Sequence, residues 1–183
     1  MIKVIGGSMR GLNLFSPDND DVRPTTGRIK EDMFNIISAY IPDAHFLDLF
    51  SGSASVGIEA ISRGAEKAYF VDNSNSSISL IKKNITKAKL TDEVNVVRSD
   101  AKRFLQSTRE KFDVVFIDPP YKYQSVVELI QIILDRNIIN EDGILVLEQG
   151  LSFNPSDIPL ELELFREKKY SSTAMYYYKI ACN

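Results

Sequence analysis

The sequence predicts a doubly wound α/β fold, in which a sheet of seven mostly parallel strands carries helices on both faces. Two observations predict this fold. Between residues 45 and 148, apolar runs of strand length alternate with segments whose apolar residues recur at helical spacing, and such alternation specifies a parallel sheet with right-handed crossovers. Beyond residue 159, two strand-like segments follow each other across a polar connection, which predicts an antiparallel hairpin at the sheet edge.

Runs rich in β-branched and aromatic residues predict five strands, and the run over residues 112–117, broken only by Asp113, is expected to be buried on both faces. Their ranges are 45–50, 67–72, 94–98, 112–117 and 144–148, and the edge hairpin is expected from 160–165 and 175–180. Helical spacing predicts helices over 55–63, 76–89 and 124–136, and a short helix that ends at Arg109.

An N-terminal arm, residues 1–42, precedes this domain. Residues 3–5 and 12–15 are expected to form a hairpin whose glycine-bounded connection presents Met9 and Arg10. A polar loop then leads to Thr26, which can cap a helix that starts at Gly27 and ends at Pro42. We expect that the arm does not fold independently of the domain formed by residues 43–183.

Composition disfavours several classes of protein. The 183 residues have a net charge of −3, one cysteine and one histidine. Cys182 cannot form a disulfide within the chain, and so few ligating side chains lead us to expect no metal site. Because no apolar run approaches the length of a membrane span and the N-terminus has no apolar signal region, we expect a cytoplasmic protein without membrane contact.

The strand over residues 112–117 leads into Asp118-Pro119-Pro120-Tyr121. Two prolines cannot continue a β-ladder and fix a rigid, extended turn. Three other expected strands also end in a carboxylate or a carboxylate-bearing turn, at Asp48, Asp72 and Asp100. Because the carboxyl ends of parallel strands meet at one edge, where ligands bind in open α/β sheets, we expect all four acids to face one ligand.

Each acid suits a different part of that ligand. Asp48 precedes a turn of small residues, where an acid would repel pyrophosphate but suits an ammonium group. Asp72 is placed to bind ribose hydroxyls, whereas Asp100 can accept from an exocyclic amine and the Ala101 N–H can donate to a ring nitrogen. Ammonium, ribose and adenine describe S-adenosylmethionine better than a dinucleotide. The predicted cofactor-binding residues are Asp48, Phe50, Gly52, Ser53, Asp72, Asn73, Asp100, Ala101 and Asp118.

The chain resembles class I S-adenosylmethionine-dependent methyltransferases, and its Asp-Pro-Pro-Tyr turn matches the motif of exocyclic-amine methylases. More closely, it resembles the RsmD-type family, bacterial 16S rRNA guanine-N2 methyltransferases. The matching segments run almost end to end: Ile5-Gly6-Gly7 with Arg10-Gly11, Arg23-Pro24-Thr25 with Arg28, Glu31 and Phe34, residues 47–53, residues 57–60, residues 62–65 and residues 118–121. The resemblance implies the strand order 3-2-1-4-5-7-6.

Two positions depart from the family pattern. Ala54 stands where the family usually has the second glycine of the turn, so we expect a negative φ or mild strain there. Asp72 replaces the more usual glutamate, which shortens the reach to the ribose by one methylene. Neither change removes a needed functional group, although both are expected to weaken cofactor binding somewhat.

The resemblance implies direct, in-line transfer of the methyl group to a guanine N2 amine. Asp118 and the Pro119 carbonyl are the expected acceptors for the two amine hydrogens, with Pro120 keeping the turn rigid and Tyr121 stacking on an unstacked base. Asp118, Pro119, Pro120 and Tyr121 are therefore the predicted catalytic residues. Because the site region contains no cysteine, covalent attack on a pyrimidine carbon is excluded.

The expected partner is 16S rRNA or the small ribosomal subunit, bound by a monomer. Arg10, Arg23, Thr25 and Arg28 of the arm are the candidate RNA-binding residues. The segment 23–25 has an alternative role, closing over the cofactor.

Three alternatives stay open. The same turn serves DNA methylases that act on adenine N6 or cytosine N4, although such enzymes usually carry a target-recognition region for which this chain has no room. The others are a non-catalytic, cofactor-dependent RNA-binding module and a nicotinamide dehydrogenase, the latter disfavoured by the turn sequence.

Three further features are interpreted structurally. His45 lies at the start of its strand, far from the carboxyl edge. Glu59 and Arg63 are spaced for an i,i+4 ion pair, which is worth only a few tenths of a kcal/mol if exposed. Tyr176-Tyr177-Tyr178 is interpreted as part of an alternating strand rather than a base-stacking platform.

Overall fold

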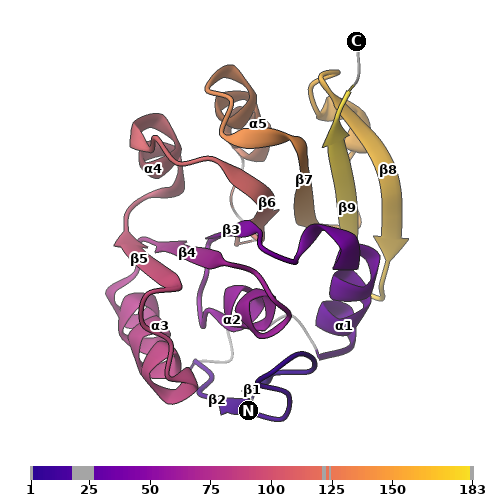
Figure 1. Cartoon of the computed structure of the whole chain (residues 1–183). Coiled ribbons are helices and arrows are strands. Elements are labelled where there is room, and N and C mark those ends of the chain that lie inside the picture. The colour runs from indigo at the N-terminus through magenta and orange to yellow at the C-terminus, as the bar shows by residue number, and fades with distance from the viewer. Residues whose placement is uncertain (1, 18–26, 121–122, 124, 182–183) are drawn as a thin grey trace.

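The computed structural model describes residues 2–17, 27–120, 123 and 125–181. Its main sheet has seven strands in the order β5-β4-β3-β6-β7-β9-β8 (Figure 1), which is the predicted order when the sheet strands are numbered along the chain. The strands are β3 (His45–Leu49), β4 (Lys67–Asp72), β5 (Val94–Arg98), β6 (Phe112–Ile117), β7 (Ile139–Gly150), β8 (Leu162–Lys169) and β9 (Thr173–Ile180). β3 to β7 pair in parallel, and β9 is antiparallel to both β7 and β8, so the predicted edge hairpin is confirmed.

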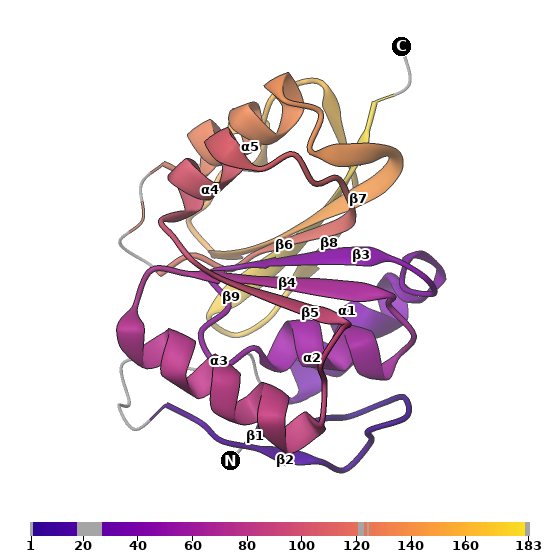
Figure 2. The ribbon, with the colours of Figure 1, turned by 60° about the vertical axis from the view of Figure 1, so that its left-hand side comes forward.

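Helices cover both faces of the sheet. The helices are α1 (Gly27–Ile36), α2 (Ser55–Ser62), α3 (Asn75–Ala88), α4 (Ala101–Ser107) and α5 (Val126–Asp135), with 3-10 turns at Ser38–Tyr40 and Pro155–Asp157. Figure 2 shows α4 and α5 on one face and α1, α2 and α3 on the other. Apolar side chains fill both layers: Leu129, Ile130 and Tyr176 belong to the first core, and Phe34, Phe46 and Tyr177 to the second. Within the described ranges, no helix is both long and apolar enough to cross a bilayer.

The tyrosine run on β9 follows the predicted alternation between faces. Tyr176 and Tyr178 pack into the core beneath α5, and Tyr177 packs into the core beneath α1. All three side chains are buried because helices cover both faces of the sheet. The run is therefore an interior strand segment, as expected.

β7 starts five residues earlier than predicted, at Ile139 rather than at residue 144. Ile139 pairs with Phe112, and the register then shifts before Val114 pairs with Ile144. The polar residues at this irregularity break the apolar pattern, yet Asn140 Nδ2 donates to Asp113 Oδ1 at 2.6 Å. A hydrogen bond between side chains therefore joins the two strands at this bulge, where the sequence has no apolar run to predict a strand.

The N-terminal arm forms the predicted hairpin with shorter strands, β1 (Ile2–Lys3) and β2 (Asn13–Leu14). The hairpin lies beneath α2 and α3, on the side away from the sheet (Figure 2). Val4 and Leu14 are buried there against Ile58 and Ile81. The arm is thus a third layer on one face of the domain.

Candidate active site

Register places the predicted acids along one edge of the sheet. Asp48 pairs with Phe116 across β3 and β6, so it lies one residue before the end of β3, and Asp118 follows the end of β6. Asp72 is the last residue of β4, and Asp100 lies two residues after β5. The four acids therefore meet at the carboxyl edge, as predicted for the ligand site.

The turn after β3 has an unusual backbone. Phe50, Gly52 and Ala54 have positive φ values of 69°, 54° and 64°. At Ala54 the expected alternative of a negative φ is wrong, and the left-handed conformation means that this residue carries the strain. Strain of this kind persists only where neighbouring contacts impose it, and here the Phe50 and Ser51 N–H groups both donate to the Val71 carbonyl, at 3.0 and 3.1 Å.

Two glycines differ in the space around them: Gly52 lies in the turn after β3, and Gly57 lies in α2. A Cβ on Gly52 would meet nothing nearer than the Phe50 carbonyl oxygen at 4.0 Å, so space remains above that residue. A Cβ on Gly57 would lie 2.3 Å from the Phe70 ring, which means that α2 packs against β4 only with glycine at this position. Ser53 is buried within the same turn. The turn can therefore bring backbone close to a ligand at Gly52.

Asp48 is a buried carboxyl at the start of this turn, 2% exposed. Its Oδ2 accepts from the Gly57 N–H at 3.1 Å. Burial raises the pKa of Asp48 to about 8, although the Gly57 N–H opposes the rise, and the nearby Asp72 carboxylate adds to it. Such a group gains most from a cationic ligand, because a positive charge offsets the cost of its ionisation.

Asp72 fixes the geometry at the end of β4. Its Oδ2 accepts from the Gly52 N–H at 3.0 Å, and its Oδ1 accepts from the Ser74 N–H at 2.9 Å. The carboxylate therefore holds the turn after β3 and the start of α3 together. Each oxygen keeps further acceptor capacity for hydroxyl groups. Asn73 is exposed directly beside it.

Asp100 caps α4. Its side chain accepts from the Arg103 N–H at 3.1 Å, and it is exposed, whereas Ala101 is buried at the first position of the helix. N-terminal helix N–H groups lack partners within the helix, so the backbone here offers donors to a ligand.

Asp118 and Pro119 follow β6 directly. Asp118 is half-buried and Pro119 is buried, while Pro120 is exposed. Burial raises the pKa of Asp118 well above its usual range, and the carboxylates of Glu148 and Asp48 raise it further. The predicted stacking residue Tyr121 lies outside the described residues. The geometry therefore places a carboxyl group with unusual proton affinity at the centre of the carboxyl edge.

Sequence reasoning missed two residues of this site. Glu148, near the end of β7, is a fifth acid at the same edge, and its position at a strand end was the available signal. Tyr123 packs edge-on against Phe50, with ring centroids 5.1 Å apart. Its N–H donates to the Pro120 carbonyl at 2.8 Å, so Tyr123 contacts both Pro120 and the turn after β3.

The predicted RNA-binding residues lie apart from the acids. Arg10 is exposed on the hairpin and Arg28 is exposed at the start of α1. Arg23 and Thr25 fall outside the described part of the chain, as does the proposed helix cap Thr26. No described contact joins Arg10 or Arg28 to the carboxyl-edge acids.

Glu59 of α2 binds the N-terminal arm, a role that its spacing from Arg63 does not indicate. The expected pair with Arg63 forms at 2.8 Å, and Glu59 is fully buried, so the small contribution of an exposed pair does not apply to it. It also accepts from the Ile5 and Gly6 N–H groups, at 2.8 and 2.7 Å, and pairs with the buried Lys30 at 3.0 Å. One carboxylate therefore ties the hairpin and α1 to α2.

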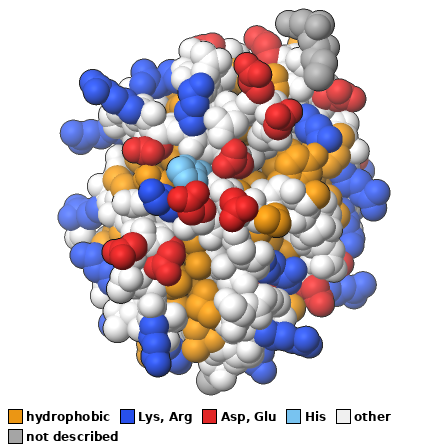
Figure 3. Space-filling view, viewed as in Figure 1, with side chains coloured by type: hydrophobic (Ala, Val, Ile, Leu, Met, Phe, Trp, Pro, Cys, Tyr) orange, Lys and Arg blue, Asp and Glu red, His pale blue; other side chains and the backbone are white. Residues whose placement is uncertain are grey.

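The opposite edge of the sheet has a different character. His45 starts β3, and its ring lies 3.6 Å from Glu66 Oε2, in keeping with a structural position. Figure 3 shows acidic side chains gathered around the histidine on this face, with Lys and Arg mainly towards the rim. This edge is therefore not suited to a polyanion.

The chain matches a known protein family along almost its whole length. The family model described as "Conserved hypothetical protein 95" matches residues 2–179. Ribosomal RNA small subunit methyltransferase D of Escherichia coli K12 is 32% identical over 178 residues, which cover 97% of this chain and 89% of that protein.

Two further comparisons agree. YlbH of Bacillus subtilis, whose name marks an rRNA methyltransferase activity as provisional, is 36% identical over 181 residues, which cover 97% of this chain and 98% of that protein. The solved structure of yhhF from Escherichia coli, also titled provisionally as a methyltransferase, has a TM-score of 0.89 at 32% identity and covers 98% of this chain and 97% of its own. The chain therefore belongs to the Conserved hypothetical protein 95 family, the RsmD-type methyltransferases that its motifs predict.

Proposed function

We propose that the chain transfers a methyl group from S-adenosylmethionine to the exocyclic N2 amine of a guanine in 16S rRNA. Family membership supports an S-adenosylmethionine-dependent rRNA methyltransferase. The observation that carries the choice of an amine is the Asp118–Pro119 turn, which ends the central strand β6 beside Asp48 and Glu148.

The residues at the carboxyl edge fit the cofactor. When bound, S-adenosylmethionine supplies a methyl group on a sulfonium sulfur, which an amine lone pair can displace in line. Asp48 would hold the cationic amino group, and Asp72 with Asn73 would hold the ribose. Asp100 and the Ala101 N–H would hold the adenine. The backbone at Phe50, Gly52 and Ser53 would border the amino-acid part, because space remains above Gly52.

Asp118 and Pro119 would act as an amine clamp. A guanine N2 lone pair is delocalised into the ring, so the nitrogen is a poor nucleophile. An acceptor for each amine hydrogen turns the nitrogen towards tetrahedral geometry and aims its lone pair at the methyl carbon. With the cofactor bound, the amine would take the methyl group as the bond from that group to sulfur breaks, leaving the electron pair on sulfur. The positively charged nitrogen would then lose its proton to the Asp118 carboxylate.

The raised pKa of Asp118 supports this last role. In its ionised form, a carboxylate whose pKa lies above its usual range is a stronger base than an ordinary carboxylate. Pro119 and Pro120 restrict the backbone that presents the Pro119 carbonyl. Tyr121 would stack on the extruded base, and Tyr123 against Phe50 would support the neighbouring turn.

The arm would bind the RNA backbone. Arg10 and Arg28 are exposed on the arm, and we assign both, with Arg23 and Thr25, to contacts with the rRNA. We propose that residues 1–42 do not fold alone, since Glu59 of α2 supplies acceptors to the hairpin backbone. We also propose that the protein is a monomer of 20.7 kDa and acts in the bacterial cytoplasm, where small ribosomal subunits form.

Three substrates test the proposal. Purified protein and S-adenosylmethionine carrying a labelled methyl group are incubated with deproteinised DNA, unmodified 16S rRNA and small ribosomal subunits. We expect label in the rRNA, either naked or within the subunit. Label in DNA alone would identify a DNA methylase and overturn the proposal. Tight cofactor and RNA binding without any transfer would identify a non-catalytic module.

A further inference from the structure

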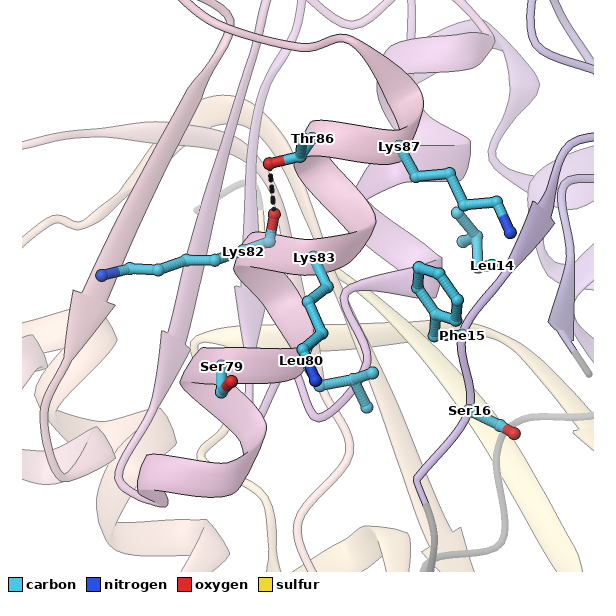
Figure 4. A pocket seen from close by; sticks show the side chains of 9 residues that line it. All are labelled: Leu14, Phe15, Ser16, Ser79, Leu80, Lys82, Lys83, Thr86 and Lys87. Atoms are coloured by element: carbon cyan, nitrogen blue, oxygen red, sulfur yellow. Dashed lines mark hydrogen bonds between the residues drawn. The ribbon is translucent and has the colours of Figure 1, made fainter.

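A groove on the outer side of α3 lies outside the candidate active site. It has a volume of about 1100 Å³ and is lined by α3 and by the residues at the exit of β2, which include Phe15 (Figure 4). The α3 side contributes Lys82, Lys83 and Lys87. The lining is therefore a mixture of cationic side chains and an aromatic ring.

The charged side chains that line this groove are all positive. Residues 73–91 contain four lysines and no acidic residue, although the whole chain has a net charge of −3. Among the residues that the structure describes, no carboxylate forms an ion pair with Lys83 or Lys87. These two lysines are four residues apart, about 6 Å along the helix axis. Figure 4 shows Lys87 extending towards Phe15, Lys83 running along α3 towards Leu80, and Lys82 pointing to the opposite side.

Phe15 presents an aromatic ring from a fixed backbone. Its side chain is 49% exposed, and Lys87 Nζ lies 4.2 Å from the ring centroid. The Phe15 N–H donates to Asn84 Oδ1 at 2.7 Å, and its carbonyl accepts from Asn84 Nδ2 at 3.0 Å. Asn84 is fully buried, and its two hydrogen bonds to the Phe15 backbone resemble those that a residue of a neighbouring strand would make. The ring is thus pre-positioned beside the lysines.

The same asparagine connects the groove to the cofactor turn. Asn84 Nδ2 also donates to the Ser53 carbonyl at 2.9 Å. In addition, α3 begins three residues after Asp72, and about 12 Å of helix separates its first residue from Lys83. The groove therefore leads away from the edge at which the methyl group would be transferred.

We propose that this groove holds a single-stranded segment of the rRNA next to the methylated nucleotide. Phosphates contact Lys83 and Lys87, and one base stacks on Phe15. Alternating phosphates and bases match a groove that alternates cations with an aromatic face. The inference rests on the proposed rRNA methyltransferase function and adds a contact surface separate from the arginines of the arm.

A matched pair of charge variants tests the phosphate contacts. Lys83→Gln/Lys87→Gln removes two positive charges from the groove. Arg109→Gln/Lys111→Gln removes two exposed positive charges from the connection between α4 and β6, on the opposite face of the sheet. Affinity for an unmodified 16S rRNA transcript is measured for each across a range of salt concentrations, and cofactor affinity is measured by calorimetry.

The groove variant should bind the transcript on the order of tenfold more weakly than the control at about 0.1 M salt. The slope of log affinity against log salt should become shallower by about 1.4, since each lost contact to single-stranded RNA removes roughly 0.7. Cofactor affinity should match the wild type in both variants. Equal RNA affinity and equal slopes for the groove variant and the control would overturn the phosphate contacts.

Phe15→Leu tests the stacking contact. Leucine keeps an apolar side chain at an exposed position but removes the aromatic face, so RNA affinity should fall roughly fivefold or more without a change in the salt slope. Wild-type affinity in this variant would overturn the stacking contact. These binding measurements do not depend on turnover. If the wild-type protein binds the transcript through this groove but methylates no rRNA, the proposed function is refuted and the groove contact is not.

Discussion

Two carboxyl groups at the carboxyl edge both have raised pKa values, and we assign them different roles. Asp48 is buried beneath the turn after β3, where a cation would stabilise its ionised form. Asp118 lies half-buried directly after β6, where the target amine would meet it in the proposed reaction. Burial is the main cause of the raised pKa of both residues. Their assigned roles therefore differ only because each would face a different part of the ligands. The two residues therefore make separable predictions.

Asp118→Asn should abolish methyl transfer while leaving RNA binding largely intact. An amide keeps the size of the side chain and one acceptor oxygen, but it cannot take the proton from the methylated nitrogen. We expect a fall in kcat of at least about 100-fold, the lower range for general-base catalysis. Single-turnover transfer to rRNA measures this effect, and undiminished transfer would show that Asp118 does not act on the amine.

The affinity for S-adenosylmethionine should rise between about pH 6 and pH 8. Because the pKa of free Asp48 is about 8, the group is mostly protonated at the lower pH and must lose a proton to pair with the ammonium. Calorimetry in buffers of different ionisation enthalpy should detect proton release on binding below pH 8. Asp48→Asn should bind weakly, with a smaller pH dependence. A wild-type affinity that does not change over this range would contradict the role of Asp48.

At the scale of elements, a buried ion cluster joins the arm to α2. Glu59 accepts from two hairpin N–H groups and pairs with Lys30 of α1 and Arg63 of its own helix. Hydrogen bonding from Ile5 and the charge of Lys30 hold the pKa of Glu59 below its usual range in spite of burial. Burial itself lowers the pKa of Lys30. Removal of one partner therefore leaves a buried charge uncompensated.

Glu59→Gln should lower the free energy of unfolding by about 3 kcal/mol, since breaking a buried ion pair from one side costs roughly 3–5 kcal/mol. Glu66→Gln is the matched control: this side chain is exposed, and its loss should cost within about 0.5 kcal/mol. Urea unfolding at neutral pH measures both values. Equal stability of the two variants would show that the cluster does not hold the arm.

Sequence patterns predicted elements far better than they predicted contacts. The strands β4, β5 and β6 have the predicted bounds because runs rich in apolar residues lie there between polar flanks. By contrast, the first half of β7 was missed, because side-chain bonding at its bulge leaves no apolar signal. The spacing of Glu59 and Arg63 revealed their pair, but nothing local indicates that the hairpin returns to bury it. Tyr123 was missed for the same reason.

For the whole molecule, the arm acts as a layer that covers apolar surface of the domain. Met33, Phe34 and Ile37 pack with Phe46 of β3, and Val4 and Leu14 pack with Ile58 of α2. All of these side chains are almost fully buried. The arm therefore completes two parts of the core besides carrying the arginines that we assign to RNA contacts.

A protein that contains residues 43–183 alone should lose its cooperative unfolding transition. Removing the arm exposes a contiguous apolar face on α2 and the neighbouring strands, which promotes association and loosens side-chain packing. Near-UV circular dichroism and thermal unfolding measure this outcome. A shortened protein with the same cooperative transition as the full chain would show that the arm is dispensable for folding.

The identity of the methylated nucleoside tests the central claim most directly. Unmodified small ribosomal subunits are incubated with the wild-type protein and S-adenosylmethionine, and the rRNA is digested to nucleosides for mass spectrometry, with the Asp118→Asn protein as the control. The amine clamp on guanine predicts N2-methylguanosine with the wild-type protein and none with the variant. N6-methyladenosine or N4-methylcytidine in its place would contradict the assignment to guanine.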